Sequence, residues 1–243
     1  GQSLFAVAAL SIAAARAAAK LASITYADLP AILTIDEALA AKSFLPGTEQ
    51  PYEMGRGDAD AAIAAAPHRL EGSIRIGGQE HFYLEGQVAL AVPGEDDDVT
   101  VYSSTQHPSE IQHSVAKVLG VPNSAVTVEC RRMGGGFGGK ESQGNLPAAA
   151  AALVAKTTGR PAKARYDRDD DFRITGKRHD FRIDYRVGFD GDGRIEGIVF
   201  EQAARCGMSF DLSMAICDRA MLHADNVYYL PNVRILSRRC LTH

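Results

Sequence analysis

Residues 133–141 read MGGGFGGKE, with five glycines arranged around Phe137, and this stretch decides how the surrounding chain is interpreted. Residues 125–130, just before it, are typical of a strand. The alanine-rich residues 146–156, just after it, predict a helix that ends at Gly159 and Pro161. Because glycine has no side chain, such a loop brings the main chain close to whatever it binds. We expect its N–H groups to face an anionic or oxo group.

The same loop matches two nucleotide-binding patterns, and we interpret both matches as coincidental. Residues 134–139 fit G-x-G-x-x-G, but the preceding unit is not the start of a βαβ fold. Residues 134–140 fit G-x-x-x-x-G-K, yet Glu141 stands where a serine or threonine would bind magnesium. A carboxylate there would repel phosphate.

Composition excludes several other classes of function. The net charge of −4, with scattered Lys and Arg, offers no surface for nucleic acid. The four cysteines form no C-x-x-C pair, and the seven histidines show no H-E-x-x-H spacing, so no disulfide framework or zinc site is expected. Arg16 and Lys20 interrupt the apolar N-terminal stretch, which argues against export and against a membrane span. We therefore expect a cytoplasmic protein with neither a nucleic-acid nor a membrane partner.

Acidic residues near position 170 resemble a calcium loop only superficially. Asp167, Asp169 and Asp171 alternate as calcium ligands can, but Phe172 stands where such a loop needs glycine. We interpret them as a solvated helix start.

Hydrophobic periodicity and turn residues predict an α+β fold rather than a doubly wound parallel sheet. Strands are expected at residues 3–9, 23–26, 70–76, within 82–92, and at 99–103, 125–130, 181–189 and 194–204. Helices are expected at residues 11–21, 35–41, 108–119 and 146–156. We predict a small mixed unit at 1–42, an extended linker rich in Pro and Gly at 43–69, and a mixed-sheet domain at 70–243, cut from something longer at both ends.

Three separate motifs resemble the large subunit of the xanthine dehydrogenase and oxidase family. They are GGGFGGKE at 134–141, GGQEHFYLE at 77–85 and DRAMLH at 218–223, and they occur in the family's order. The resemblance implies that residues 1–42 are the end of a hammerhead domain and that residues 70–243 are the first part of a molybdopterin-binding domain. The implied reaction is purine oxidation, by attack of a metal-bound hydroxyl and hydride transfer to a sulfido ligand.

The resemblance also implies roles for individual residues. Gln79 would hydrogen-bond an oxygen ligand of molybdenum, and the backbone of Phe137 and Gly138 would contact the cofactor close to the metal. Glu141 and Arg219 would bind the purine and stabilise the negative charge that develops on it. No acidic residue lies three or four positions from Arg219, so we expect Glu141 to be its charge partner.

The family comparison implies further groups that lie beyond this sequence. The catalytic base glutamate is expected after His243, and the 2Fe–2S and FAD groups on partner domains or a partner subunit. We expect an intact enzyme that is oligomeric and a segment that is inactive alone. Two alternatives stay open: an aldehyde or N-heterocycle oxidoreductase of the same family, and a non-catalytic interaction or assembly module.

Overall fold

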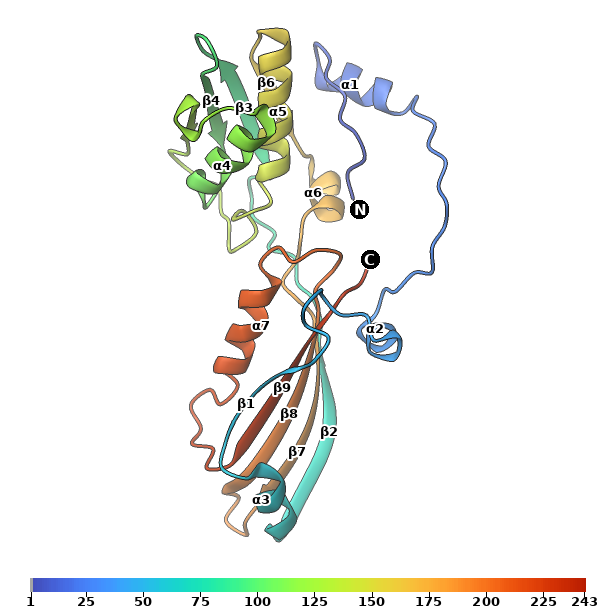
Figure 1. Cartoon of the computed structure of the whole chain (residues 1–243), viewed down its shortest axis with the longest axis vertical. Coiled ribbons are helices and arrows are strands. Elements are labelled where there is room, and N and C mark those ends of the chain that lie inside the picture. Colours follow the sequence, from blue (N-terminus) through green and yellow to red (C-terminus); the bar gives the residue numbers. More distant parts are fainter. Residues whose placement is uncertain (1) are drawn as a thin grey trace. The chain divides into compact units, whose positions relative to one another are not determined.

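The computed structural model describes residues 2–243, which form two compact units. The glycine-loop unit combines the residues up to Ala27 with Glu80–Lys177. The five-stranded unit combines Asp28–Gln79 with Arg178–His243 (Figure 1). Each unit is therefore assembled from two separate stretches of the chain.

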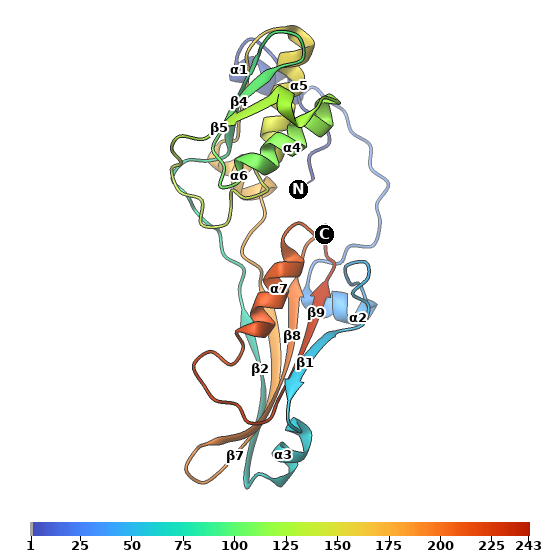
Figure 2. The same ribbon diagram turned by 60° about the vertical axis from the view of Figure 1, so that its left-hand side comes forward.

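The glycine-loop unit is built on a four-stranded sheet with the order β5-β4-β3-β6. Its strands are β3 (Val88–Pro93), β4 (Val99–Ser103), β5 (Val126–Glu129) and β6 (Ala162–Arg165). Its helices are α1 (Ile12–Ala19), α4 (Pro108–Leu119), the 3-10 turn η1 (Asn123–Ala125), α5 (Asn145–Thr158) and α6 (Arg168–Ile174). Only β4 and β5 run parallel, and α4 makes the crossover between them (Figure 2).

Helices α4 and α5 close the core of this unit against the sheet. Ile111 and Val115 of α4 are fully buried, and each stabilises the fold by about 1.5–3 kcal/mol. The buried face of α5 is made of small residues, Ala148, Ala151, Ala152 and Ala155. Both helices end at a left-handed glycine, as the sequence predicts, at Gly120 and Gly159.

The five-stranded unit has the strand order β1-β9-β8-β7-β2. Its strands are β1 (Tyr52–Arg56), β2 (His68–Ile76), β7 (Phe181–Phe189), β8 (Ile195–Arg205) and β9 (Val233–Cys240). Its helices are α2 (Ile35–Ala41), α3 (Ala59–Ala65) and α7 (Ser213–Leu222). The predicted strands at 181–189 and 194–204 form an antiparallel hairpin, β7 with β8, and the single parallel pair of this unit, β8 with β9, is joined through α7. The α+β prediction is confirmed.

Helices cover both faces of the larger sheet. Ala203 of β8 packs with α2, while the next residue, Ala204, packs with Cys217 of α7. Because adjacent strand residues face opposite sides, α2 and α7 lie on opposite faces. Helix α3 packs against Val199, on the α2 side.

Several predictions about the first 69 residues differ from the structure. Residues 3–9 and 23–26 form no strands, and apart from Ile32 and a few helical residues this region up to Leu33 is exposed. Residues 43–69 are not an extended linker, because β1 pairs with β9 and α3 packs on the sheet. The predicted hammerhead segment, 1–42, is divided between the two units at Ala27. Proline and glycine do not prevent a strand whose partner lies far along the chain, and a hydrophobic segment without strand partners does not form a strand.

None of the helices described between residues 2 and 243 is long and apolar enough to cross a membrane.

Candidate functional site

The loop between β5 and α5 holds an unusual backbone conformation. Gly135 and Gly138 have φ values of +92° and +89°, and Phe137 between them has a φ of +55°. A left-handed conformation is costly for a residue with a bulky side chain and persists only where the surroundings impose it. The ring of Phe137 is nevertheless 75% exposed. The strain therefore serves to shape the backbone, not to bury the ring.

Side chains from outside the loop hold it near both ends. The Gly134 N–H donates to Glu85 Oε2 at 2.9 Å, and the Gly138 N–H donates to Gln106 Oε1 at 2.9 Å. The predicted contact of the Phe137 and Gly138 backbone with a cofactor stays a prediction, and in the structure the Gly138 N–H is occupied by Gln106.

Three consecutive N–H groups at the top of the loop stay available. Among residues 2–243, no acceptor binds the N–H of Gly135, Gly136 or Phe137. Successive N–H groups beside left-handed residues form a concave site that suits anionic oxygen. This is the feature that the five glycines predict.

Three of the glycines are required by close approach, and the first is Gly134, where a Cβ would lie 2.5 Å from Glu85 Cβ. A Cβ on Gly136 would lie 2.5 Å from Gln106 Oε1, and a Cβ on Gly139 would lie 2.7 Å from the His81 ring. No side chain fits at any of these positions without displacing these neighbours.

Gln106 is a site residue that the sequence interpretation missed. Its Oε1 accepts from the N–H groups of Gly138 and Lys140, at 2.9 and 3.2 Å. Its Nε2 has no acceptor among residues 2–243, and the residue is exposed. The segments that follow the parallel strands β4 and β5 leave the sheet at the same edge, which brings Gln106 to the loop. That parallel pairing was the signal that could have identified it.

A buried hydrogen-bond network supports the loop from below. Gln87 Nε2 donates to the Gly139 carbonyl at 2.8 Å and to the Tyr83 hydroxyl at 2.9 Å. Tyr83 donates to Asp171 Oδ1 at 2.6 Å, and burial together with this carboxylate raises the pKa of Tyr83. Asp171 is only 1% exposed, so the prediction that it is solvated is wrong, although Asp167 does cap α6.

Glu141 directly follows the loop and is half-buried. Among residues 2–243, its carboxylate has no hydrogen bond or ion pair within the structure. It is therefore free to bind a polar group of a ligand.

Arg219 lies on α7 of the five-stranded unit and is exposed. The buried face of α7 consists of Ser213, Cys217 and Met221, so Arg219 points away from the core. The neighbouring Asp218 is already paired with Arg239. Glu141 belongs to the other unit, and its pairing with Arg219 stays a prediction.

Gln79 is the last residue of the first stretch of the five-stranded unit. Its main chain pairs with Arg178, and its Oε1 accepts from Arg178 Nη1 at 3.1 Å. The predicted contact of Gln79 with a molybdenum ligand stays a prediction. Gln106 is the side-chain amide that the structure brings to the glycine loop.

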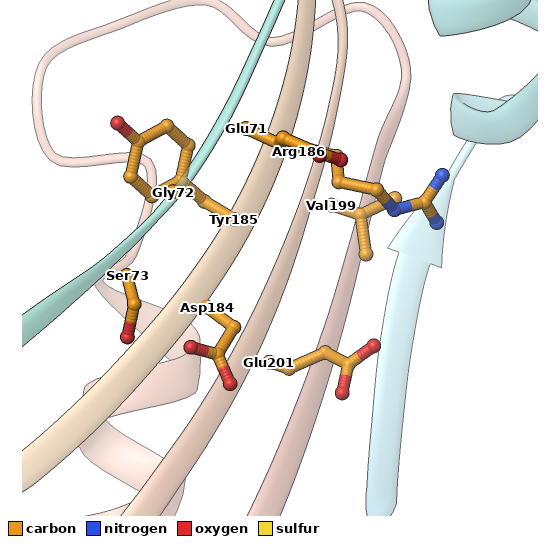
Figure 3. Close-up of a pocket in the computed structure, with 8 residues that line it drawn as sticks. All are labelled: Glu71, Gly72, Ser73, Asp184, Tyr185, Arg186, Val199 and Glu201. Atoms are coloured by element: carbon orange, nitrogen blue, oxygen red, sulfur yellow. The ribbon is translucent and has the colours of Figure 1, made fainter.

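The five-stranded unit carries a polar hollow that contains none of the predicted site residues (Figure 3). Ser73, Asp184 and Glu201 are register partners on neighbouring strands and line it together. Burial opposes the charge on Asp184, but hydrogen bonds from Ser73 and Arg182 keep the pKa of Asp184 below its usual value. Asp184 is paired at 2.8 Å with Arg182 of the same strand, and we do not assign the reaction to this hollow.

Metal binding by side chains alone has no support in the part of the chain that the structure describes. Across residues 2–243, no group of three or more His, Cys, Asp or Glu side chains is placed to hold a metal ion. A metal at the glycine loop would therefore need ligands from a cofactor rather than from these side chains.

Comparison with known proteins adds independent information. Residues 44–243 match the family described as molybdopterin cofactor-binding domain. The xanthine dehydrogenase of Drosophila pseudoobscura pseudoobscura is 45% identical over 244 residues, and the xanthine dehydrogenase/oxidase of Felis catus is 43% identical over 230 residues. These alignments cover 100% and 94% of this chain but only 18% and 17% of the relatives' length.

Solved structures show the same fold. The aldehyde oxidoreductase from Desulfovibrio gigas aligns with a TM-score of 0.84 and 27% identity, over 96% of this chain and 26% of that one. Quinoline 2-oxidoreductase from Pseudomonas putida 86 aligns with a TM-score of 0.82 and 23% identity, over 96% of this chain and 30% of that one. The predicted resemblance to the xanthine dehydrogenase family is confirmed.

Proposed function

Because the chain belongs to the family of molybdopterin cofactor-binding domains, we propose that it is part of a molybdenum hydroxylase that oxidises a purine such as xanthine or hypoxanthine. The observation that carries the proposal is the glycine loop, with three free N–H groups and a free carboxylate, Glu141, directly after it. The 45% identity to a xanthine dehydrogenase over the whole chain supports this choice of substrate.

The residues of the loop fit a molybdopterin group. The free N–H groups of Gly135, Gly136 and Phe137 suit the oxo oxygens of such a group. Gln106 adds a side-chain donor at the same place, because its oxygen is held by the loop while its Nε2 is free. When bound, the group would supply a two-electron oxidation that adds oxygen to an electron-poor carbon.

The protein groups at the loop would bind and orient rather than react. Gln106 Nε2 and the Phe137 N–H would donate hydrogen bonds to oxygen atoms near the metal, which orients those atoms and tunes their basicity. Gly138, with its N–H held by Gln106, would keep the backbone close to the cofactor without donating to it. Gln79 is proposed to hydrogen-bond an oxygen ligand of the metal.

Glu141 and Arg219 would define the substrate. A carboxyl group at Glu141 can hydrogen-bond a purine ring nitrogen, and the guanidinium of Arg219 can stabilise negative charge that spreads onto the ring during oxidation. Glu141 is half-buried without an internal partner and Arg219 is exposed, which is consistent with this role.

One competing substrate class has specific support. The Desulfovibrio gigas protein with a TM-score of 0.84 is an aldehyde oxidoreductase. An aldehyde offers no ring nitrogen for Glu141, so the polar residue at this position favours a purine.

The proposal extends to the rest of the protein. It includes 2Fe–2S and FAD groups on partner domains or a partner subunit, a cytoplasmic location, and an oligomeric intact enzyme. Residues 1–243 alone are proposed to be inactive, and turnover of xanthine by this polypeptide would contradict that.

The test uses the full-length protein that contains this chain. Molybdenum and pterin are quantified, and kcat/KM is measured for xanthine and for an aromatic aldehyde. We expect Glu141→Ala to lower kcat/KM for xanthine by about 10²-fold, because the hydrogen bond between the carboxyl group and a purine ring nitrogen is lost, with little effect on the aldehyde.

Glu95→Ala is the matched control, since Glu95 is exposed in the turn between β3 and β4 of the same unit. Absence of both molybdenum and pterin from the purified protein would refute the proposal and favour an assembly module. Unchanged xanthine kinetics in Glu141→Ala would refute the assignment of the substrate.

A further inference from the structure

The lysine that follows the glycine loop is turned into the protein. Lys140 has no exposed surface, and its Nζ donates to Ser104 Oγ at 2.7 Å. The same Nζ lies 3.4 Å from Glu85 Oε2 and 4.6 Å from the centroid of the Tyr83 ring. Burial lowers the pKa of Lys140, and the charge of Glu85 opposes this effect. The ammonium group is therefore committed to internal partners.

Glu85 connects this lysine to the other end of the loop. Its Oε2 accepts from Ser104 Oγ at 2.6 Å and from the Gly134 N–H at 2.9 Å, in addition to Lys140. The Glu85 N–H in turn donates to the Gly134 carbonyl at 3.1 Å. Gly134 is the first glycine of the loop and Lys140 follows the last. One carboxylate thus ties the two ends together.

The conformation of residues 135–137, at the top of the loop, depends on how its two ends are held. The N–H groups of Gly135, Gly136 and Phe137 have no acceptor among residues 2–243, and Phe137 holds a left-handed conformation. Nothing within this stretch compensates for that strain, so it must be offset by the contacts on either side. Closing the ends also reduces the number of conformations that the top can adopt.

We propose that Lys140, Ser104 and Glu85 form a clasp that holds the free N–H groups of the loop in position to receive the cofactor. Lys140 and Glu85 are then positioning residues that do not touch the cofactor themselves. The identity of the ligand rests on the proposed function above, whereas the clasp is a property of the polypeptide. It accounts for a fully buried lysine beside a loop that is otherwise glycine.

Hydrogen exchange and cofactor retention in the full-length protein test the clasp. In Lys140→Met, we expect the hydrogen-bonded loop amides of Gly134, Gly138 and Lys140 to exchange about tenfold faster, while α4 and α5 keep their protection. We expect molybdenum loss on dialysis to be about tenfold faster. Ser104→Ala removes one oxygen atom of the clasp and should change both measurements in the same direction, which covers the case in which Lys140→Met does not fold.

Lys156→Met is the matched control, because Lys156 forms an exposed ion pair with Asp97 at 2.8 Å in the same unit. It should change neither measurement. Glu85→Gln leaves the buried ammonium without its counter-charge, so it should loosen the loop more than the double variant Glu85→Gln/Lys140→Met does.

Two outcomes would overturn the clasp. One is loop exchange in Lys140→Met and Ser104→Ala equal to that in Lys156→Met. The other is faster exchange throughout α4 and α5, which would make Lys140 an ordinary structural residue. If the wild-type protein holds neither molybdenum nor pterin, the proposed function fails, and the exchange comparison alone still decides the clasp.

Discussion

Replacing Asp171 by alanine should weaken the support beneath the glycine loop. The Asp171 carboxylate accepts from the Tyr83 hydroxyl at 2.6 Å, from the Gln87 N–H at 3.1 Å and from Thr175 Oγ1 at 3.1 Å. Thr175 Oγ1 keeps a second acceptor, the Asp171 carbonyl at 2.6 Å, but the other two donors lose their partner. Each buried donor left unsatisfied costs about 1–3 kcal/mol. The expected loss of unfolding free energy is therefore about 2–6 kcal/mol.

Urea unfolding, followed by tyrosine fluorescence and circular dichroism, measures this loss, since the chain has no tryptophan. Hydrogen exchange assigns the loss to the glycine-loop unit. Asp169→Ala is the control on the same helix, because Asp169 is exposed and contributes about 0.3–1 kcal/mol through the helix dipole. Equal destabilisation by the two variants would show that the buried network does not support the loop.

Two further perturbations probe the same loop. Gly139→Ala places a Cβ 2.7 Å from the His81 ring and should lower the free energy of unfolding, measured by heat or urea, by about 1–3 kcal/mol. Gly191→Ala is the control, because Gly191 has open space around it and its replacement should be near neutral. Equal effects of the two variants would contradict the close approach at Gly139. Burial opposes the charge on Glu85, but the hydrogen bond from Gly134 helps to hold the pKa of Glu85 below its usual 4.5. Protection of the Gly134 amide, which donates to Glu85, should therefore be complete above about pH 4.5 and be lost as pH falls through the lower folded-state pKa. Amide exchange rates, corrected for the intrinsic pH dependence of exchange, measure this protection. If Glu85→Gln loses protection over the same pH range, the Glu85 carboxylate is not the cause and the prediction is refuted.

The sequence alone determined where several helices begin and end, because the signals for these positions are local. Ser11 caps α1, Thr34 and Glu37 form a capping box on α2, and Gly120 and Gly159 end α4 and α5. Each of these depends on hydrogen bonds within a few residues, so a short stretch of sequence specifies it. The glycine loop was identified for the same reason.

Only the tertiary structure decided which distant residues meet. Gln106 reaches the glycine loop because β4 and β5 are parallel neighbours, and Lys140 meets Glu85 across 55 positions of the chain. The strand at Tyr52–Arg56 was predicted as linker because its partner, β9, lies near the other end of the sequence. Strand pairing and buried ion pairs depend on contacts between residues far apart in the chain, and no periodicity within one segment contains that information.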